Sequence, residues 1–353
     1  MNLPTTTRAA VLVEIGQPLK IMNLNLPDLK PGQVLVEIDY AGICHTQLHE
    51  VRGKRGPDLF LPHVLGHEGA GTVLSIGDGV KKVKVGDRVV LSWIKGEGAD
   101  VSSATYQSDI GPINSGAIST FMTYSVTCEN RLVPMTDGNL PQRDAALLGC
   151  AVPTGAGAII NTANVGKDTS VSVFGVGGIG MSAVLAAVMR EAITIIAVDI
   201  VDDKLNAAKS AGATHVINAT RVNPVDRIKD ITGGVGVDIA IEAAGKPETM
   251  EAAYSSVAYG GGLCILVGNV SFGKKISLDP YDLIKGKRIV GSWGGETDPD
   301  QDLPKYAEMY VKGIFPFGQL VSHEWPLEEI NTAFDELEAG RVSRALVNVK
   351  KAP

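Results

Sequence analysis

The segment GICHTQLH, residues 42–49, places one cysteine and two histidines within eight positions of a mostly apolar chain. The whole sequence contains 4 cysteines and 6 histidines, and 4 of those histidines lie between His45 and His67. Thiolate and imidazole are ligands that zinc prefers in proteins. The cluster therefore indicates either a metal site or side chains that only fill a core, and the rest of the sequence must decide between them.

A glycine-rich segment, GVGGIG, has the spacing of a dinucleotide-binding turn. It follows the apolar run 171–174 and precedes a helical pattern, as that turn requires. The first glycine would allow the tight bend, the second would let a pyrophosphate approach the backbone, and the last would let helix pack on strand. The cofactor-binding residues predicted here are Gly175, Gly177, Gly178, Ile179 and Gly180.

Asp199 ends the next apolar run, 19 residues beyond Gly180. An acid at about this spacing accepts hydrogen bonds from a ribose 2′-hydroxyl and repels a 2′-phosphate. Asp202 and Asp203 add to that repulsion. The sequence therefore predicts NAD rather than NADP, with Lys204 either at the ribose or solvated on a helix.

Two kinds of segment must position these residues. Early in the chain, β-branched runs such as 34–43 and 71–93 are broken by glycine turns, which indicates a β-rich module. From about residue 170, short apolar runs alternate with helical patterns, which is typical of a parallel sheet covered by helices. We therefore expect an α/β protein of two domains.

Composition narrows the partners and the compartment. The net charge is -7 and no dense block of lysine and arginine occurs, so nucleic acid and anionic membranes are poor candidate partners. The start of the chain lacks a signal-peptide pattern. The uncharged stretch 171–189 contains 4 glycines, which indicates a turn rather than a membrane span. Few, scattered cysteines predict a reducing compartment, and we expect a cytoplasmic protein.

Several motifs in the same order resemble the zinc-dependent medium-chain alcohol dehydrogenases, and the resemblance runs essentially from end to end. The motifs are GICHTQLH, LGHEGAG (65–71), VGDRVV (85–90), LLGCAVPTGAGA (147–158) and the glycine-rich turn. The resemblance implies a β-rich GroES-like catalytic domain over residues 1–151 and 293–353. It also implies a doubly wound Rossmann domain over residues 152–292, and hydride transfer between an alcohol, or its aldehyde or ketone, and NAD.

The same resemblance implies a catalytic zinc held by Cys44, His67 and Cys150, with a fourth position open for substrate. A Cys2His zinc site in alcohol dehydrogenase is a standard example of an open catalytic site. When bound there, zinc would make an alcohol hydroxyl more acidic. Glu68, next to His67, is expected to be an alternate ligand or a partner of the ligands, or else a buried ion-pair partner.

Further roles follow from the resemblance. Thr46 and His49 would form a proton relay, by way of a cofactor ribose hydroxyl, to solvent. Trp93 would line the substrate pocket or fill the core. The remaining cofactor contacts would be His45 and Arg344 at the pyrophosphate, and Thr154 and Val267 along the nicotinamide.

Three departures from the family are visible. Segment 94–119 contains no cysteine where the family often has four, so we expect one zinc per chain and no structural zinc. Gln47 stands where the family commonly has aspartate near the metal, which would either lower the pKa of a bound alcohol or weaken zinc retention. Cys150 stands where many polyol and sugar dehydrogenases have glutamate, which favours alcohols.

Alternatives stay open at this point. A polyol, sugar-derivative or glutathione-adduct dehydrogenase would use the same zinc and NAD machinery. A non-catalytic NAD-binding protein would show a broken relay or a missing ligand, and the sequence shows neither. From the family, we expect a small-molecule substrate and a homo-dimer or homo-tetramer.

Overall fold

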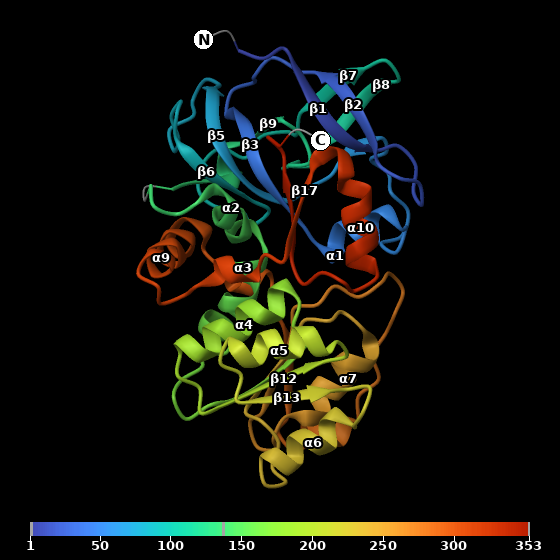
Figure 1. The fold of residues 1–353 in the computed structure, drawn as a ribbon, viewed down its shortest axis with the longest axis vertical. Coiled ribbons are helices and arrows are strands. Elements are labelled where there is room, and N and C mark those ends of the chain that lie inside the picture. Colours follow the sequence, from blue (N-terminus) through green and yellow to red (C-terminus); the bar gives the residue numbers. More distant parts are fainter. Residues whose placement is uncertain (1–2, 136–137, 352–353) are drawn as a thin grey trace. The chain divides into compact units, whose positions relative to one another are not determined.

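The computed structural model describes residues 3–135 and 138–351, which form two compact units (Figure 1). The first unit contains the chain up to Cys150, the segment Asp298–Gly313 and the residues from Val321 onward. The second unit contains Ala151–Thr297 and Ile314–Leu320. Each unit has its own sheet and hydrophobic core.

The first unit is built on β-strands. A closed barrel is formed, in order, by β1 (Thr6–Leu12), β2 (Lys20–Asn25), β7 (Thr105–Ser108), β8 (Gly111–Ser115) and β4 (His63–Val64). A second sheet runs in the order β10 (Leu132–Pro134), β6 (Arg88–Ser92), β5 (Glu68–Ile76), β3 (Gln33–Ile43), β18 (Ala345–Asn348) and β17 (His323–Pro326), and β9 (Tyr124–Cys128) also pairs with β3. The last strands of the chain thus complete a sheet begun by the first ones.

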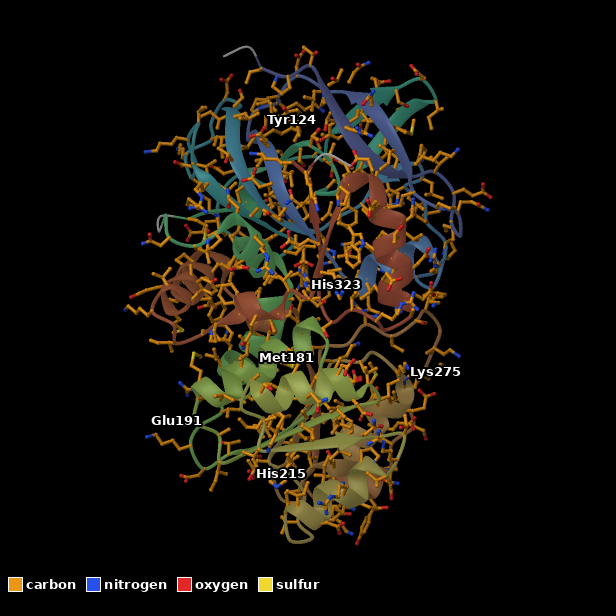
Figure 2. The ribbon with its side chains drawn as sticks, viewed as in Figure 1. Tyr124, Met181, Glu191, His215, Lys275 and His323 are labelled. Atoms are coloured by element: carbon orange, nitrogen blue, oxygen red, sulfur yellow. The ribbon has the colours of Figure 1, made fainter. Side chains whose placement is uncertain are left out.

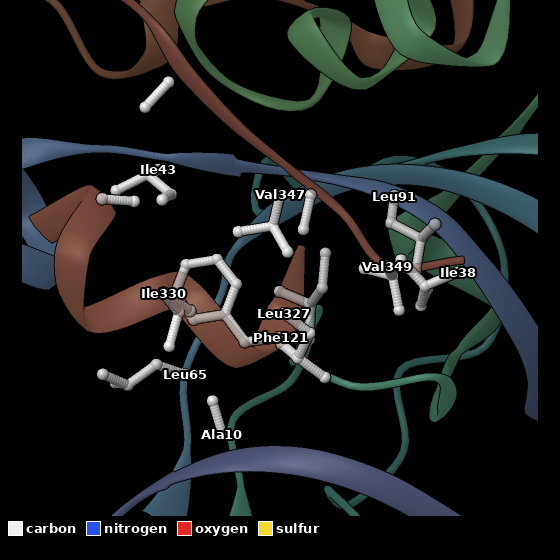
Figure 3. Packing of buried hydrophobic residues seen from close by; sticks show 14 of the residues in the cluster. Ala10, Ile38, Ile43, Leu65, Leu91, Phe121, Leu327, Ile330, Val347 and Val349 are labelled. Carbon is white, nitrogen blue, oxygen red and sulfur yellow. The ribbon is translucent and has the colours of Figure 1, made fainter. Parts of the chain in front are cut away.

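Short helices complete this unit. They are α1 (His45–Val51), η1 (Glu129–Arg131), α2 (Gln142–Ala145), η2 (Ala146–Gly149), α9 (Pro299–Val311), η6 (Leu327–Glu329) and α10 (Ile330–Glu338). Helix α10 has apolar residues at helical spacing, and Ile330 and Phe334 on that face are buried. Figure 3 shows Ile330, Phe121 and Val347 among the buried side chains of the main core cluster of this unit. Helix α1 packs beside α10.

The second unit contains a parallel sheet of six strands. Its order is β13 (His215–Asn218), β12 (Thr194–Asp199), β11 (Ser170–Phe174), β14 (Ile239–Glu242), β15 (Leu263–Leu266) and β16 (Arg288–Gly291). Its helices are α3 (Ala151–Gly157), η3 (Ala158–Thr162), α4 (Gly178–Met189), α5 (Asp202–Ser210), α6 (Pro224–Ile231), α7 (Pro247–Ser256), α8 (Pro280–Ile284), η4 (Gly294–Glu296) and η5 (Phe317–Leu320). The chain winds outward from β11 in both directions, and Figure 1 shows α5 and α6 on opposite faces of the sheet. This is the doubly wound nucleotide-binding topology, and it confirms the predicted α/β class.

The compact units divide the chain somewhat differently from the boundaries expected from sequence. Residues 293–297 and 314–320, which were expected in the catalytic domain, lie in the second unit. The side chain of Asn161 donates to the carbonyl of Gly295 at 3.1 Å, which ties η4 to the helix before it. Phe315 and Phe317 are fully buried, and η5 contacts α4. Apolar burial therefore draws this short segment out of the C-terminal part of the first unit.

The cysteine-free segment 94–119 forms the β7–β8 hairpin and the loop before it. The thiol of Cys128 donates to the carbonyl of Val101 at 3.1 Å, and the amide of Gln33 donates to the carbonyl of Ser102 at 3.0 Å. The backbone N–H of Ala99 donates to Glu129 at 2.9 Å. Packing and hydrogen bonds to the loop backbone thus hold this segment.

Within residues 3–135 and 138–351, no single helix is long and apolar enough to cross a membrane. The adjacent segments Gln142–Gly149 and Ala151–Thr162 reach the required length and composition only when they are taken as a pair. The uncharged stretch 171–189 consists of β11 and α4 with the glycine turn between them.

Candidate active site

Cys44 lies where β3 ends and α1 begins. It caps the helix with extended backbone angles, φ -126° and ψ 155°. Its backbone N–H donates to Oε1 of Gln47 at 3.1 Å, so the first turn of α1 is closed by a side chain of the same helix. A strand that runs directly into a capped helix gives the thiol a defined position.

His67 precedes β5, after a turn that only glycine can form at residue 66. Gly66 has a φ of +99°, and a β-carbon there would lie 2.3 Å from Oγ1 of Thr120. The backbone N–H groups of Thr120 and Phe121 both donate to the carbonyl of Leu65, at 3.2 and 3.1 Å. Strand β5 then pairs antiparallel with the end of β3, with Gly69 opposite Ala41. The pairing brings the segment of His67 next to that of Cys44.

Cys150 follows η2, and a side chain of β6 fixes this turn. The hydroxyl of Ser92 donates to the carbonyl of Gly149 at 2.9 Å. A β-carbon on Gly149 would lie 2.4 Å from the carbonyl oxygen of Leu91, so the turn packs directly on the strand backbone. Neither Ser92 nor Thr120 was singled out from sequence, because their partners lie far along the chain and form no local pattern.

The three expected zinc ligands are brought together in the first unit. The ligand atoms of Cys44, His67 and Cys150 all lie within 4.8 Å of one another. Nε2 of His67 is 3.2 Å from Sγ of Cys150, so this nitrogen faces the thiols. Two thiols and one imidazole, with no fourth ligand joining this group among the residues that the structure describes, fit an open zinc site.

The three groups influence each other's ionisation. A hydrogen bond with Cys150 holds the pKa of Cys44 well below its usual value, while sharing that proton raises the pKa of Cys150 well above its own. Burial lowers the pKa of His67, but the hydrogen bond and attraction to Cys44 outweigh burial and raise the pKa overall. The lowered pKa of Cys44 favours a thiolate among the three ligand residues, which suits a cation site.

A buried ion pair lies behind the ligands. Glu68 is 0% exposed and Arg344 is 4% exposed, and Nη2 of Arg344 contacts Oε2 of Glu68. Nη1 of Arg344 also donates to the carbonyl of Ile43 at 3.1 Å. Burial raises the pKa of Glu68, and Arg344 partly offsets that increase. Oε1 of Glu68 lies 3.9 Å from Nε2 of His67, so this carboxylate faces both the arginine and the ligand group.

Gln47 contacts the opposite side of His67. Its side chain is 1% exposed, and its Nε2 lies against Nδ1 of the imidazole. Its Oε1 is occupied by the backbone N–H of Cys44. A single buried amide therefore touches two of the three expected ligand residues.

The other expected residues of α1 follow the helix surface. His45 is exposed, whereas Thr46 and His49 are half-buried. Oγ1 of Thr46 lies 3.7 Å from Sγ of Cys44, so the hydroxyl reaches the ligand group. Burial lowers the pKa of His49, and the nearby charges of His45 and Lys54 lower it further. The imidazole of His49 is thus kept neutral at a pH near 7 and can accept a proton.

The glycine-rich turn lies between β11 and α4 in the second unit. Gly175 has a φ of +85°, and a β-carbon on Gly180 would lie 1.9 Å from the carbonyl oxygen of Gly175. Gly177 caps α4, with Gly178 and Ile179 as its first residues. Gly175, Gly177 and Gly178 place no β-carbon at the start of α4, which would let a pyrophosphate approach the N-terminus of this helix.

Asp199, at the end of β12, lies beside this turn. Its Oδ2 accepts a hydrogen bond from the backbone N–H of Val176 at 2.9 Å. Its Oδ1 accepts from the backbone N–H groups of Ile200 and Val201, at 2.7 and 3.1 Å. Lys204 is half-buried in the first part of α5. The carboxylate is thus oriented by the backbone at the position where a ribose acid is expected.

The remaining expected contacts lie on separate elements. Thr154 of α3 is 5% exposed, and its Oγ1 has no hydrogen-bond partner among the described residues. Val267 is half-buried directly after β15. Trp93 follows β6 and packs partly buried against the main core cluster of the first unit. An unpaired hydroxyl that is buried in this way is suited to a bound group that supplies its partner.

One other group in the described chain has the residue types of a metal site: Glu50, Asp58 and His63. Nε2 of His63 lies 2.8 Å from Oδ2 of Asp58, which gives each side chain a partner. The two histidines labelled in Figure 2, His215 on β13 and His323 on β17, are exposed and belong to neither group.

Comparisons with known proteins agree with this geometry. Residues 30–137 match the alcohol dehydrogenase GroES-like domain, and residues 178–312 match the zinc-binding dehydrogenase family. The S-(hydroxymethyl)glutathione dehydrogenase of Synechocystis sp. is 33% identical, over 97% of this chain and 99% of that protein. The protein of the same name from Photobacterium damsela is 34% identical, with the same two coverages of 97% and 99%.

Solved structures give the same result. Benzyl alcohol dehydrogenase from Acinetobacter calcoaceticus superposes with a TM-score of 0.88 at 34% identity, covering 98% of this chain and 99% of that one. An alcohol dehydrogenase zinc-binding domain protein from Burkholderia ambifaria gives a TM-score of 0.90 at 34% identity, with coverages of 98% and 99%.

Proposed function

Because this chain belongs to the zinc-dependent medium-chain alcohol dehydrogenases, which are oxidoreductases, we propose that it transfers a hydride between a primary or secondary alcohol and NAD. The reverse reaction reduces the corresponding aldehyde or ketone. The observation that carries the proposal is the convergence of Cys44, His67 and Cys150 on one point of the first unit. Zinc bound there would polarise the substrate oxygen and favour loss of its proton.

The protein's own groups would then handle that proton. The hydroxyl of Thr46, 3.7 Å from Sγ of Cys44, is placed to hold a proton beside the ligands. His49 lies one turn further along α1, and its lowered pKa keeps it ready to accept a proton. Both side chains come from the helix that Cys44 caps, so one element orients ligand and relay together.

The choice of NAD rests on Asp199. Its carboxylate is held by three backbone N–H groups beside the glycine turn, and it would accept from ribose hydroxyls while repelling a phosphate. Thr154 and Val267 would contact the nicotinamide and Lys204 the ribose. His45 and Arg344 would contact the pyrophosphate, and the buried pair with Glu68 keeps the Arg344 side chain in one orientation.

A second candidate is oxidation of a glutathione adduct. The observation that favours it is the name shared by several relatives of about one-third identity, S-(hydroxymethyl)glutathione dehydrogenase. The benzyl alcohol dehydrogenase, of similar identity, favours a simple alcohol instead. The substrate pocket decides between them, and Trp93 would form part of its wall.

Three finer features belong to this proposal. We expect one zinc per chain, because segment 94–119 has no cysteine to bind a second one. All four cysteines are free thiols, which suits the cytoplasm. We expect a homo-dimer or homo-tetramer: β16 ends its sheet in the described chain, and Ile284 and Trp293 nearby are 78% and 79% exposed.

The test combines turnover with metal content. Purified protein is assayed by NADH absorbance with NAD and a panel of benzyl alcohol, aliphatic alcohols, polyols, and formaldehyde mixed with glutathione. Zinc content is measured in parallel on Cys44→Ala, on Cys150→Ala and on a matched control, Cys264→Ala, whose thiol is buried in the core of the second unit. We expect NAD-selective, chelator-sensitive activity, with zinc lost from the first two variants only.

The outcomes separate the candidates. Activity on formaldehyde with glutathione but not on free alcohols would select the adduct dehydrogenase. Full zinc retention in Cys44→Ala and Cys150→Ala would refute the assigned metal site. Turnover that is unchanged in zinc-free protein would refute the mechanism.

A further inference from the structure

Gln47 contacts His67 on the side away from the thiols, and whether this contact is a hydrogen bond depends on which ring nitrogen of His67 carries the proton. His67 presents Nε2 to Cys150 and Nδ1 to Gln47. A histidine that binds a metal through Nε2 keeps its ring proton on Nδ1, and Nδ1–H must then donate to an acceptor. The residue facing Nδ1 is therefore required to accept.

Gln47 already accepts once. The backbone N–H of Cys44 donates to its Oε1 at 3.1 Å, and the side chain is 1% exposed, so bulk water cannot supply a second acceptor. An amide has one oxygen that accepts and one nitrogen that only donates. Turning the amide by 180° would satisfy Nδ1–H but would leave the NH2 group facing the N–H of Cys44. In either orientation of the amide, two hydrogen-bond donors face each other across a buried contact whenever His67 binds zinc through Nε2.

The neutral, zinc-free form of His67 has no such conflict. With its ring proton on Nε2, His67 can donate towards Sγ of Cys150, 3.2 Å away. Nδ1 then accepts from the NH2 group of Gln47, while Oε1 keeps its bond from Cys44. The same amide that fits the Nε2–H tautomer of His67 therefore conflicts with its ligand form.

We propose that Gln47 is a positioning residue that selects the non-ligating tautomer of His67 and so weakens zinc binding by this site. A carboxylate at position 47 would accept from the N–H of Cys44 and from Nδ1–H of His67 at once. Residues that accept a hydrogen bond from a metal-binding histidine typically change metal affinity by about 10- to 100-fold. We therefore expect the Gln47→Glu variant to bind zinc about 10- to 100-fold more tightly than the wild type. The inference rests on the zinc site of the proposed function and predicts an enzyme that exchanges its metal readily.

The affinity test uses two isosteric variants. Zinc affinity is measured by competition with a chromophoric chelator for the wild-type protein, for Gln47→Glu and for Gln33→Glu. Gln33 is a matched control: it is 2% exposed, its Oε1 accepts from the backbone N–H of Lys30 at 2.9 Å, and its Nε2 donates to Ser102 at 3.0 Å. We expect tighter binding for Gln47→Glu and a change of less than about threefold for Gln33→Glu.

A second readout does not depend on affinity. Long-range 15N–1H NMR of zinc-free protein labelled at histidine shows which ring nitrogen carries the proton, and a His67→Asn spectrum assigns the signal. At a pH where His67 is neutral, we expect the Nε2–H tautomer in the wild type and the Nδ1–H tautomer in Gln47→Glu. The wild-type spectrum alone tests the proposal if the variant does not fold.

Each result has one meaning. An Nδ1–H tautomer in the zinc-free wild type, or equal zinc affinity in wild type and Gln47→Glu, overturns the proposal and leaves the proposed function intact. Tighter zinc binding with an unchanged tautomer also overturns it, because added charge alone would explain the gain. A wild type that binds no zinc at saturating metal would instead refute the zinc site itself.

Discussion

Replacing Gly66 by alanine tests whether the turn before His67 is built as the structure shows. Two costs are expected at this position. A φ of +99° is unfavourable for any residue with a β-carbon, and that β-carbon would lie 2.3 Å from Oγ1 and 2.7 Å from the backbone N of Thr120. The second contact involves backbone that is held by a hydrogen bond to Leu65, so it cannot move away freely.

Gly86 separates the two costs. It has a φ of +91°, close to that of Gly66, and a β-carbon there meets nothing within 4 Å. Gly86→Ala therefore carries only the backbone cost, about 1–2 kcal/mol. Gly66→Ala adds the overlap, which typically costs a further 1–3 kcal/mol or so. At roughly 2–4 °C per kcal/mol for a domain of this size, the melting temperatures of the two variants should differ by several degrees.

The assay is equilibrium urea unfolding of zinc-free protein, followed by zinc titration of the folded variants. We expect the free energy of unfolding to fall further in Gly66→Ala than in Gly86→Ala. Zinc affinity should fall only in Gly66→Ala, because His67 is the next residue. Equal destabilisation of the two variants, within about 0.5 kcal/mol, would refute the close packing of the turn on Thr120.

Three further predictions concern buried or oriented charges. Glu68→Gln leaves the guanidinium of Arg344 buried without a carboxylate and should lower the free energy of unfolding by about 3–5 kcal/mol; a double-mutant cycle with Arg344→Met that gives no coupling would contradict this. Burial raises the pKa of Glu242 above its ordinary 4.5. Above pH 4.5 the folded protein therefore keeps a proton that the unfolded chain has lost, so the stability that this group contributes declines as the pH rises. The stability of Glu242→Gln relative to wild type should therefore improve from pH 4.5 towards 8 in urea titrations, and a constant difference would refute it. Asp199→Asn should raise the ratio of NADP to NAD affinity at least about tenfold, because the charge that repels the 2′-phosphate is gone. The measurement is fluorescence titration with NADH and NADPH, and equal changes for both cofactors would show that Asp199 does not select between them.

Features carried by short stretches of chain could be predicted from the sequence. The glycine turn and the strand–helix alternation that surrounds it are local patterns, and the structure places that turn between β11 and α4 as expected. The ligand types of Cys44, His67 and Cys150 could be named because each stands in its own motif. The α/β class followed from the strand–helix alternation, and the family from the order of the motifs.

Features that depend on distant partners could not be predicted. Ser92 donates a hydrogen bond to Gly149, which lies 57 residues further along the chain. Gly66 packs against Thr120, which also belongs to a distant segment. The compact units place residues 314–320 with the second unit, because η5 contacts α4, which lies far earlier in the chain. A single sequence carries no signal for such pairings.

By itself the sequence determined which chemical groups the protein contains and which of them lie at turns, strand ends and helix starts. It showed Gln47 in place of an acid, but left open what that change does. Only the tertiary structure decided that one amide faces both Cys44 and His67, and that Glu68 is buried against Arg344. The physical reason is that hydrogen-bond polarity and burial belong to pairs of groups, and folding alone decides which groups become pairs.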